Sequence, residues 1–371
     1  MHVVIEAPLV DERPTGSAIH LVQLVRALRE LRPEMRLTSV HSGIHRGDAH
    51  LASSDRINAG VAPVTVPVPT TLLRAVESWL QVPRRRWFTG PFDVYHQFHT
   101  DALPAAPSRK LLVTVHDTVQ IRWPQAEGRL HRNARRVVRR ASGVVTVSNF
   151  SREELVSAYG IDQKRVHVIH NGVDTNRFTP EVSANVRERV RRRLGLTRPY
   201  FLYLGGFTPR KNLPRLLEAY AASGTKSFLD LVIAGPAGMP LSPVASLAAE
   251  LGIQREVRQL GYVDDRDIPI LYASASALAY PSLYEGFGLP VLEAYASGVP
   301  VLTSNTTALP EVAGPYATLV DPTDVSQIAA GLTAVLDDSV DAREGRLAHA
   351  RGFSWTEVAR RLLDLYEAMV G

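Results

Sequence analysis

The chain has 371 residues, more than the roughly 250–300 at which a single hydrophobic core stops growing, so we expect about two domains. Apolar residues make up 45% and charged residues 21%, which excludes a disordered protein. Cysteine is absent, which excludes disulfides, thiolate metal ligands and cysteine nucleophiles, and fits a cytoplasmic protein. The net charge is +5, and the excess of basic side chains lies in residues 1–180.

Short apolar runs alternate with helical patterns along the first half. Residues 2–7 predict a buried strand, and the following helical pattern ends before Pro33. The opening residues MHVVIEAP have no basic segment before the apolar run, so we expect no secretion signal. This alternation predicts a parallel sheet with helices on both faces. Further strands are expected at 37–40, 61–66, 111–115, 143–147 and 166–169.

The same alternation starts again at residue 200. Residues 181–198 are highly charged and predict a surface helix and linker, so we place the domain boundary near residue 180. The longest uncharged stretch, 231–249, is interrupted by prolines and cannot form a membrane-spanning helix. Strands are expected at 200–204, 229–234, 256–263, 275–280 and 299–303, and helices at 213–222, 243–251, 266–273, 290–297 and 324–336.

The two halves predict an α/β protein with two Rossmann-like, doubly wound parallel-sheet domains. The N-terminal domain would span residues 1–180 and the C-terminal domain residues 181–354. Residues 355–371 place apolar side chains on one helical face, and we expect this helix to pack back on the N-terminal domain. Open parallel sheets bind ligands at the carboxyl ends of their strands, so two such domains facing each other would form an interdomain cleft containing the site.

Residues 280–298, YPSLYEGFGLPVLEAYASG, predict a strand, a tight loop and a short helix. The N-terminus of such a helix would bind a phosphate through the main-chain N–H groups of Phe287, Gly288 and Leu289. Glu285 and Glu293 lie close to this anion site in the sequence. Two carboxylates are compatible with a bound anion if they accept hydrogen bonds from hydroxyl groups of the same ligand. A nucleotide sugar carries both the phosphates and the hydroxyls.

The pattern EGFGLPVLE resembles the signature of the retaining glycosyltransferases of family 4, which have the two-domain GT-B fold. The resemblance extends over nearly the whole chain and implies an enzyme that transfers a hexose-type sugar from a nucleotide diphosphate sugar with retention of configuration. The motifs are similar to those of bacterial mannosyltransferases, which makes GDP-mannose the first candidate donor and UDP- or dTDP-sugars the next. Supporting segments are VTVHD (113–117), HNGVD (170–174), YLGGFTPRKNLPRLLEAY (203–220), VIAGP (232–236), LGYVDDRDIPILYASASAL (260–278) and VPVLTSNTTALPEVAG (299–314).

The resemblance also implies individual roles. Glu293 would bind the ribose hydroxyls of the donor, and Glu285 would contact hydroxyls of the transferred sugar. Arg210 and Lys211 match the basic pair that holds the diphosphate, where fixed cations stabilise the charge that develops on the leaving group. In the N-terminal half, His116 would reach the transferred sugar.

Other N-terminal residues are weaker candidates. Gly16 and Ser17 match the position of a glycine-rich turn over the donor phosphates, although PTGSA lacks the frequent double glycine, and this loop could shape acceptor binding instead. Asp117 and His99 each follow a predicted strand and are candidates for acceptor or sugar contact. The acceptor could be a glycan, a lipid-linked glycan or a small molecule.

No metal is expected. His41, His45 and His50 lack carboxylates at a spacing that would complete a metal site. Asp265 and Asp267 form an Asp-x-Asp pattern, but their position before IPILYASA favours a helix N-cap with an acidic first turn. The nucleotide sugar would therefore be a substrate, with no divalent cation or other cofactor required.

Basic runs at 84–86, 129–140 and 187–193 predict either a solvated surface or peripheral contact with an anionic membrane. Interleaved aromatic residues are lacking, which argues against nucleic acid. A nicotinamide oxidoreductase would need a glycine fingerprint after the first strand, and VVIEAPLVDERPTG has a single late glycine. A non-catalytic nucleotide or sugar binder, a sugar phosphorylase and an epimerase on the same fold remain alternatives to the transferase.

Overall fold

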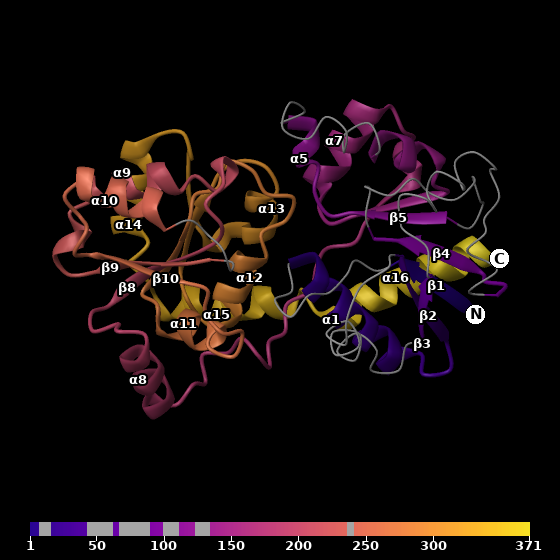
Figure 1. The fold of residues 1–371 in the computed structure, drawn as a ribbon, viewed down its shortest axis with the longest axis horizontal. Coiled ribbons are helices and arrows are strands. Elements are labelled where there is room, and N and C mark those ends of the chain that lie inside the picture. Colours follow the sequence, from indigo (N-terminus) through magenta and orange to yellow (C-terminus); the bar gives the residue numbers. More distant parts are fainter. Residues whose placement is uncertain (7–15, 43–61, 67–89, 99–110, 123–133, 236–240) are drawn as a thin grey trace. The chain divides into compact units, whose positions relative to one another are not determined.

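The computed structural model describes residues 1–6, 16–42, 62–66, 90–98, 111–122, 134–235 and 241–371. Within these residues the chain forms two compact units, shown as ribbons in Figure 1. The first unit contains residues 1–172 together with 355–371, and the second contains residues 173–354. Each unit is built on one parallel sheet, and each is described by itself below.

The first unit has the strand order β3-β2-β1-β4-β5-β6-β7, with every neighbouring pair parallel. Strands β1, β4 and β5 are buried along their whole length. The strands are β1 (His2–Glu6), β2 (Arg36–Ser42), β3 (Ala62–Val66), β4 (Val94–Gln97), β5 (Leu111–Val115), β6 (Gly143–Thr146) and β7 (Val166–Val168). The helices are α1 (Gly16–Leu31), α5 (Val119–Arg122), residues 134–140, α7 (Asn149–Tyr159), the 3-10 helix η1 (Gln163–Arg165) and α16 (Trp355–Val370).

The second unit has the parallel order β10-β9-β8-β11-β12-β13. The strands are β8 (Tyr200–Leu204), β9 (Asp230–Ala234), β10 (Val257–Gly261), β11 (Ala277–Tyr280), β12 (Val301–Ser304) and β13 (Thr318–Val320). The α-helices are α8 (Ala184–Arg193), α9 (Leu213–Ala222), α10 (Ser242–Glu250), α11 (Ile268–Ser274), α12 (Leu289–Ala296), α13 (Leu309–Ala313), α14 (Val325–Ala334) and α15 (Val340–Arg351). The 3-10 helices are η2 (Pro209–Lys211), η3 (Thr225–Ser227) and η4 (Gly314–Tyr316).

Most predicted strands and helices are present within a few residues of the expected bounds. Strand β13 was not predicted, because its three residues are too few to show a period of two. Helix α15, VDAREGRLAHAR, also lacked a signal, since its buried side chains are Arg346 and Ala350 rather than a run of large apolar residues. Arg346 is buried by pairing with Asp338 and donating to the carbonyl of Gly298.

The boundary between the units lies at residue 172 rather than near 180. The main-chain N–H of Val173 donates to the carbonyl of Phe353 at 2.8 Å. The ring of Phe178 is buried and meets the ring of Tyr272 edge-on at 5.7 Å. These contacts bring residues 173–180, which the sequence placed in the first domain, into the second unit.

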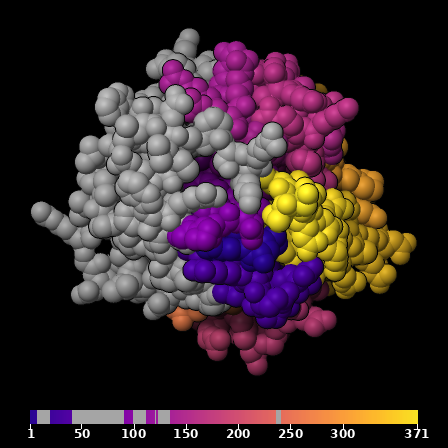
Figure 2. Space-filling model, turned by 90° about the vertical axis from the view of Figure 1, so that its right-hand side faces the viewer, coloured from indigo at the N-terminus to yellow at the C-terminus, as the bar shows by residue number. Residues whose placement is uncertain are grey.

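Helix α16 packs against α1, and the two lie side by side in Figure 1. The yellow C-terminal residues also lie next to indigo N-terminal residues in the space-filling view of Figure 2. Leu362 and Tyr366 belong to the same buried cluster as Leu24 and Leu28 of α1. The C-terminal helix therefore completes the core of the first unit, although the whole second unit and most of the first lie between the two helices in the sequence.

We expect Leu362→Ala to lower the free energy of unfolding by about 2–5 kcal/mol, because it removes a buried side chain and leaves a cavity between the helices. The exposed residue Asp364, two positions along α16, provides the matched control, and Asp364→Ala should change stability by less than about 0.5 kcal/mol. Denaturant unfolding measures both. Equal effects of the two substitutions would contradict this packing.

Candidate functional site

The order of the second sheet reverses between β8 and β11. In open parallel sheets ligands bind beyond the carboxyl ends of the strands at such a switch point. The loop after β8 contains η2 with Arg210 and Lys211, and the loop after β11 contains Glu285. Strand order therefore brings together Arg210 and Glu285, which are 75 positions apart in the sequence.

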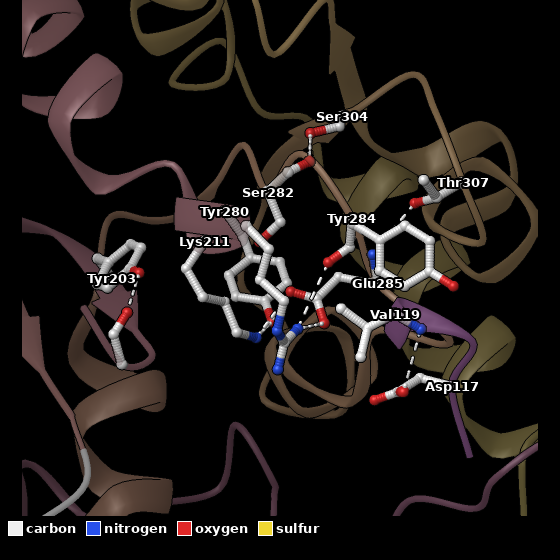
Figure 3. Close-up of polar contacts among 12 residues, drawn as sticks. Asp117, Val119, Tyr203, Lys211, Tyr280, Ser282, Tyr284, Glu285, Ser304 and Thr307 are labelled. Carbon is white, nitrogen blue, oxygen red and sulfur yellow. Dashed lines mark hydrogen bonds and ion pairs between the residues drawn. The ribbon is translucent and has the colours of Figure 1, made fainter. Parts of the chain in front are cut away.

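Glu285 lies at the centre of a polar cluster formed by these two loops (Figure 3). Its Oε1 accepts hydrogen bonds from Lys211 Nζ and from the Tyr280 hydroxyl, each at 2.7 Å. Its Oε2 lies 3.0 Å from a terminal nitrogen of Arg210. Lys211 also donates to the Tyr280 hydroxyl. Glu285 is 7% exposed, whereas the Arg210 side chain is 32% exposed, so the guanidinium is the more accessible of the two.

Hydrogen bonds from the main chain and from the side chain of Asn212 hold the two loops together. Leu283 N–H donates to the carbonyl of Arg210 at 2.8 Å. The side-chain amide of Asn212 donates to the carbonyls of Pro281 at 2.9 Å and Pro322 at 2.6 Å. Asn212 has a φ of 58°, which is uncommon outside glycine, and its buried bonds compensate for that conformation.

Thr307 is the other non-glycine residue with a positive φ in the described part of the chain, at 61°. A β-branched residue is seldom found in this conformation. The Thr307 Oγ1 accepts a hydrogen bond from the main-chain N–H of Glu285 at 3.3 Å. Both strained residues therefore adjoin the Glu285 cluster, which is where local strain is expected if the cluster is functional.

Burial alone would raise the pKa of Glu285, because a charged carboxylate loses its hydration. The positive charges of Lys211 and Arg210, together with the hydrogen bonds from Lys211 and Tyr280, outweigh burial, so the pKa of Glu285 lies below its ordinary value. Burial, followed by the negative charge of Glu285, raises the pKa of Tyr280 well above its usual range. At neutral pH the cluster thus holds an ionised carboxylate and a protonated phenol.

Glu293, on α12, has a different environment. Its Oε2 accepts a hydrogen bond from the buried hydroxyl of Tyr272 at 2.8 Å. Burial raises the pKa of Glu293, and the bond from Tyr272 and the charge of Arg177 oppose that rise only in part. Across the described residues no cation forms an ion pair with Glu293, in contrast to Glu285.

Phe287, Gly288 and Leu289 lie at the N-terminus of α12, in the arrangement that the sequence predicts. Gly288 has a φ of 118°, a conformation that glycine adopts without strain. A Cβ at this position would lie 2.8 Å from Cδ2 of Leu309, so a side chain would also clash. Whether these amides bind a phosphate stays a prediction.

In the first unit, His116 directly follows β5 and is partly exposed. Its ring meets the buried ring of His20 edge-on at 4.8 Å. The Nδ1 of His20 lies 2.7 Å from Oδ1 of Asn171, in the HNGVD segment. Burial lowers the pKa of His20 to about 4, against the opposing effect of the Asn171 bond. His116 therefore borders a histidine that is neutral at physiological pH.

The remaining N-terminal candidates are less fully defined. The Oδ1 of Asp117 accepts a hydrogen bond from the main-chain N–H of Val119 at 3.3 Å, a local contact at the start of α5. Gly16 and Ser17 are the first residues of α1, and their side chains lie outside the described part. His99 also lies outside the described residues, as do His45 and His50.

The sequence predicts an aspartate N-cap before α11, and an aspartate does occupy that position, but its side chain does not form the capping hydrogen bond. Asp267 occupies the N-cap, yet its side chain makes no capping bond and pairs with Arg193 at 2.5 Å instead. Helix α11 has no acidic residue in its first turn. Asp265 pairs with Arg177 at 2.7 Å. In the parts of the chain for which positions are given, no group of three or more His, Asp or Glu side chains is arranged to hold a metal ion.

Several polar partners in these clusters carried no sequence signal of their own: Tyr272, Tyr280, Thr307, His20 and Asn171. Tyr272 and Tyr280 lie in apolar segments that read as a core helix and a core strand. Their hydroxyls find carboxylates only because the sheet brings other segments beside them. A buried tyrosine normally has a hydrogen-bond partner, but the sequence does not show which one.

Two family profiles match the chain in succession. Residues 14–177 match the profile described as Glycosyltransferase Family 4, and residues 186–350 match the one described as Glycosyl transferases group 1. The chain belongs to the family 4 glycosyltransferases. The second profile includes both loops that form the Glu285 cluster.

Curated relatives of this chain are named as mannosyl- and inositol-phosphate glycosyltransferases. O-antigen chain mannosyltransferase B of Escherichia coli is 35% identical over 61% of this chain and 60% of its own. MMP alpha-(1->4)-mannosyltransferase of Mycolicibacterium hassiacum is 34% identical over 64% of this chain and 56% of its own. A D-inositol 3-phosphate glycosyltransferase of Salinispora tropica is 36% identical over 62% and 52%, respectively. The matches thus span less than two thirds of these relatives.

Solved glycosyltransferase structures share the fold over the whole chain. HepE of Anabaena, in complex with UDP-glucose, superposes with a TM-score of 0.78 at 18% identity, covering 99% of this chain and 100% of HepE. WaaG, a glycosyltransferase involved in lipopolysaccharide biosynthesis, gives 0.70 at 18% identity, covering 99% of both chains. At such identities the likeness establishes the fold, and it confirms the predicted α/β GT-B class.

Glu285 and Glu293 should respond oppositely to loss of charge. Glu285→Gln leaves Arg210 and Lys211 without their carboxylate, and we expect the free energy of unfolding at neutral pH to fall by about 3 kcal/mol, the size of a broken buried ion pair, less what solvent recovers for the accessible Arg210. Glu293→Gln removes the cost of burying an ionised carboxylate, so it should leave stability unchanged or raise it. Urea unfolding measures both variants.

The pH dependence follows from the signs of the two shifts. The depressed pKa of Glu285 gives stability that is present above its unfolded pKa and lost as the pH falls through its folded pKa. The raised pKa of Glu293 has the reverse effect, with stability lost as the pH rises through its folded pKa. The deficit of Glu285→Gln should therefore shrink in acid. Equal deficits in both variants at neutral pH would refute the different environments described here.

Proposed function

We propose that this protein is a retaining glycosyltransferase that moves a hexose-type sugar from a nucleotide diphosphate sugar to a hydroxyl of a glycan, lipid-linked or small-molecule acceptor. The carrying observation is the Glu285 cluster, in which a buried carboxylate lies between two cations at the switch point of the second sheet. Such a cluster offers cations to a diphosphate and a carboxylate to sugar hydroxyls within one small site. Family membership adds the reaction class.

GDP-mannose is the first donor to test, because two relatives are named as mannosyltransferases. UDP- and dTDP-sugars follow, since HepE shares the fold and its structure contains UDP-glucose. The relatives' names point to an O-antigen glycan chain and to an inositol phosphate as acceptor classes. Both are hydroxyl-bearing compounds, in keeping with the reaction.

In this mechanism the bond between the anomeric carbon and the phosphate oxygen breaks while the acceptor oxygen attacks on the same face. The departing phosphate oxygen takes the acceptor proton. Arg210 and Lys211 stabilise the negative charge that develops on the diphosphate, in a site where burial strengthens their effect. Glu285 orients the sugar through its hydroxyls, and Glu293 accepts from the ribose. For His116 the family resemblance implies a contact with the transferred sugar. These fixed cations take the part that a divalent ion plays in other transferases, so no metal is required.

Exposed arginine side chains of the first unit are relevant to the type of acceptor, because a lipid-linked acceptor would lie at an anionic membrane. Arg135, Arg136 and Arg140 are exposed on the helical residues 134–140 of the first unit, whereas residues 84–86 lie outside the described part. Contact with an anionic membrane, which would suit a lipid-linked acceptor, stays a prediction. No helix among the residues with given positions is both long enough and apolar enough to cross a bilayer.

Nucleotide binding and transfer test this function. We expect one of GDP, UDP, dTDP and ADP to stabilise the protein by about 2.7 kcal/mol at 100 times its dissociation constant, equally with magnesium and with chelator. The matching nucleotide sugar should then give a product whose anomeric configuration, read by proton NMR, equals that of the donor. The double variant Arg210→Ala with Lys211→Ala leaves the buried Glu285 without its cations, so we expect it to be less stable than wild type. Under conditions where unfolding curves show that the variant is folded, its transfer should be lower than that of wild type by more than about a hundredfold.

Each contrary outcome has its own meaning. Near-normal transfer by the double variant would refute the proposed role of the cations. Inverted configuration would refute retention, and loss of activity with chelator would refute metal independence. Nucleotide binding without transfer to any acceptor or water would favour the non-catalytic binder.

A further inference from the structure

We propose that Tyr280 is a positioning residue whose hydroxyl keeps Glu285 in place when Arg210 and Lys211 turn to the diphosphate of the donor. This role rests on the proposed function of the site and deepens it. Neither the sequence motifs nor the names of the relatives assign a task to Tyr280.

Glu285 and a bound diphosphate compete for the same cations. Both carboxylate oxygens are engaged by cations, Oε1 by Lys211 and Oε2 by Arg210. A diphosphate carries more negative charge than one carboxylate and therefore draws both cations toward itself. Glu285 is almost fully buried, so a carboxylate that lost these partners without replacement would be strongly destabilised.

Among the side-chain partners that the described residues give the Glu285 carboxylate, Tyr280 is the uncharged one, so a diphosphate attracts it less strongly than it attracts Lys211 or Arg210. It is fully buried, and burial together with the charge of Glu285 raises its pKa, so it remains a donor at all working pH values. As the last residue of β11 it is fixed by the sheet, and its carbonyl accepts a hydrogen bond from Thr303 Oγ1 at 2.9 Å. Figure 3 shows its ring beside both Lys211 and the Glu285 carboxylate.

The Tyr280 hydroxyl therefore matters more with the donor bound than without it. In the free protein Glu285 has the ammonium and the guanidinium as further partners. With the cations on the diphosphate, the Tyr280 bond would keep the carboxylate aimed at the sugar hydroxyls. Loss of the hydroxyl should then weaken binding of a nucleoside diphosphate as well as transfer, beyond any effect on folding.

The test compares Tyr280→Phe with Tyr200→Phe. Tyr200 is also fully buried, and its hydroxyl donates a hydrogen bond to the carbonyl of Leu271 at 2.8 Å. It is the first residue of the neighbouring strand β8, whereas Tyr280 is the last residue of β11, so the two lie at opposite ends of adjacent parallel strands. Each substitution removes one buried hydroxyl, so denaturant unfolding corrects for general destabilisation. We expect Tyr280→Phe to bind the nucleoside diphosphate about tenfold more weakly and to lose at least tenfold in kcat/KM, whereas Tyr200→Phe keeps wild-type values for both.

The pKa of Glu285, followed by carboxyl-carbon NMR, gives a readout that a purely structural role would not move. With saturating nucleoside diphosphate, or inorganic diphosphate as the simpler probe, the pKa should rise further in Tyr280→Phe than in wild type or Tyr200→Phe. Equal pKa values and equal affinities in the two variants would overturn the role of Tyr280.

The same experiments separate this role from the proposed function. Wild type that binds the diphosphate but transfers no sugar would overturn the transferase alone, because binding and the Glu285 pKa still decide the role of Tyr280. A wild type that transfers sugar while Tyr280→Phe matches Tyr200→Phe in all readouts would overturn the positioning role alone. A wild type that binds neither nucleoside diphosphate nor inorganic diphosphate would overturn both.

Discussion

The ion pairs of Glu285 are the interaction on which the candidate site of the second unit depends. A buried carboxylate needs cations or hydrogen-bond donors, and here two cations and one phenol supply them. The loops after β8 and β11 are joined in addition by the side-chain amide of Asn212, and Thr307, at a positive φ, accepts a hydrogen bond from the Glu285 main-chain N–H. The sheet fixes where these loops meet, and the ion pairs fix how their side chains face each other.

The same pairs connect stability to function. Without a ligand, Glu285 forms ion pairs with both cations. The free site therefore avoids the destabilising effect of an unpaired buried charge. In the proposed mechanism, a bound diphosphate would replace Glu285 as the anion beside these cations and would leave the carboxylate available to sugar hydroxyls. Glu293 forms no ion pair with a cation within the described residues and accepts a hydrogen bond from Tyr272, an environment compatible with its proposed role as acceptor of hydrogen bonds from a neutral ribose. Two glutamates eight positions apart thus differ in charge environment as well as in place.

The sequence predicted much of this arrangement. The alternation of strands and helices is sufficient for two doubly wound sheets, and the motifs TPRKN and EGFGLPVLE are sufficient to select Arg210, Lys211 and Glu285. The direct pairing of these three residues could not be predicted, because motif roles describe contacts with a ligand rather than contacts within the protein. Tyr280 was hidden for another reason, since an aromatic residue at the end of a buried strand reads as core. Strand β13 was not predicted because its apolar run is too short, and helix α15 was not predicted because its buried face has no continuous apolar pattern.

Affinity of Glu285→Gln for the nucleoside diphosphate tests the central claim most directly. If the carboxylate and the diphosphate compete for Arg210 and Lys211, the neutral amide frees both cations. Calorimetric titration should then show that the variant binds the nucleoside diphosphate more tightly than wild type, even though it transfers sugar poorly. Weaker or unchanged binding by a folded Glu285→Gln protein would contradict the account, because it would show that Glu285 does not compete with the ligand for these cations.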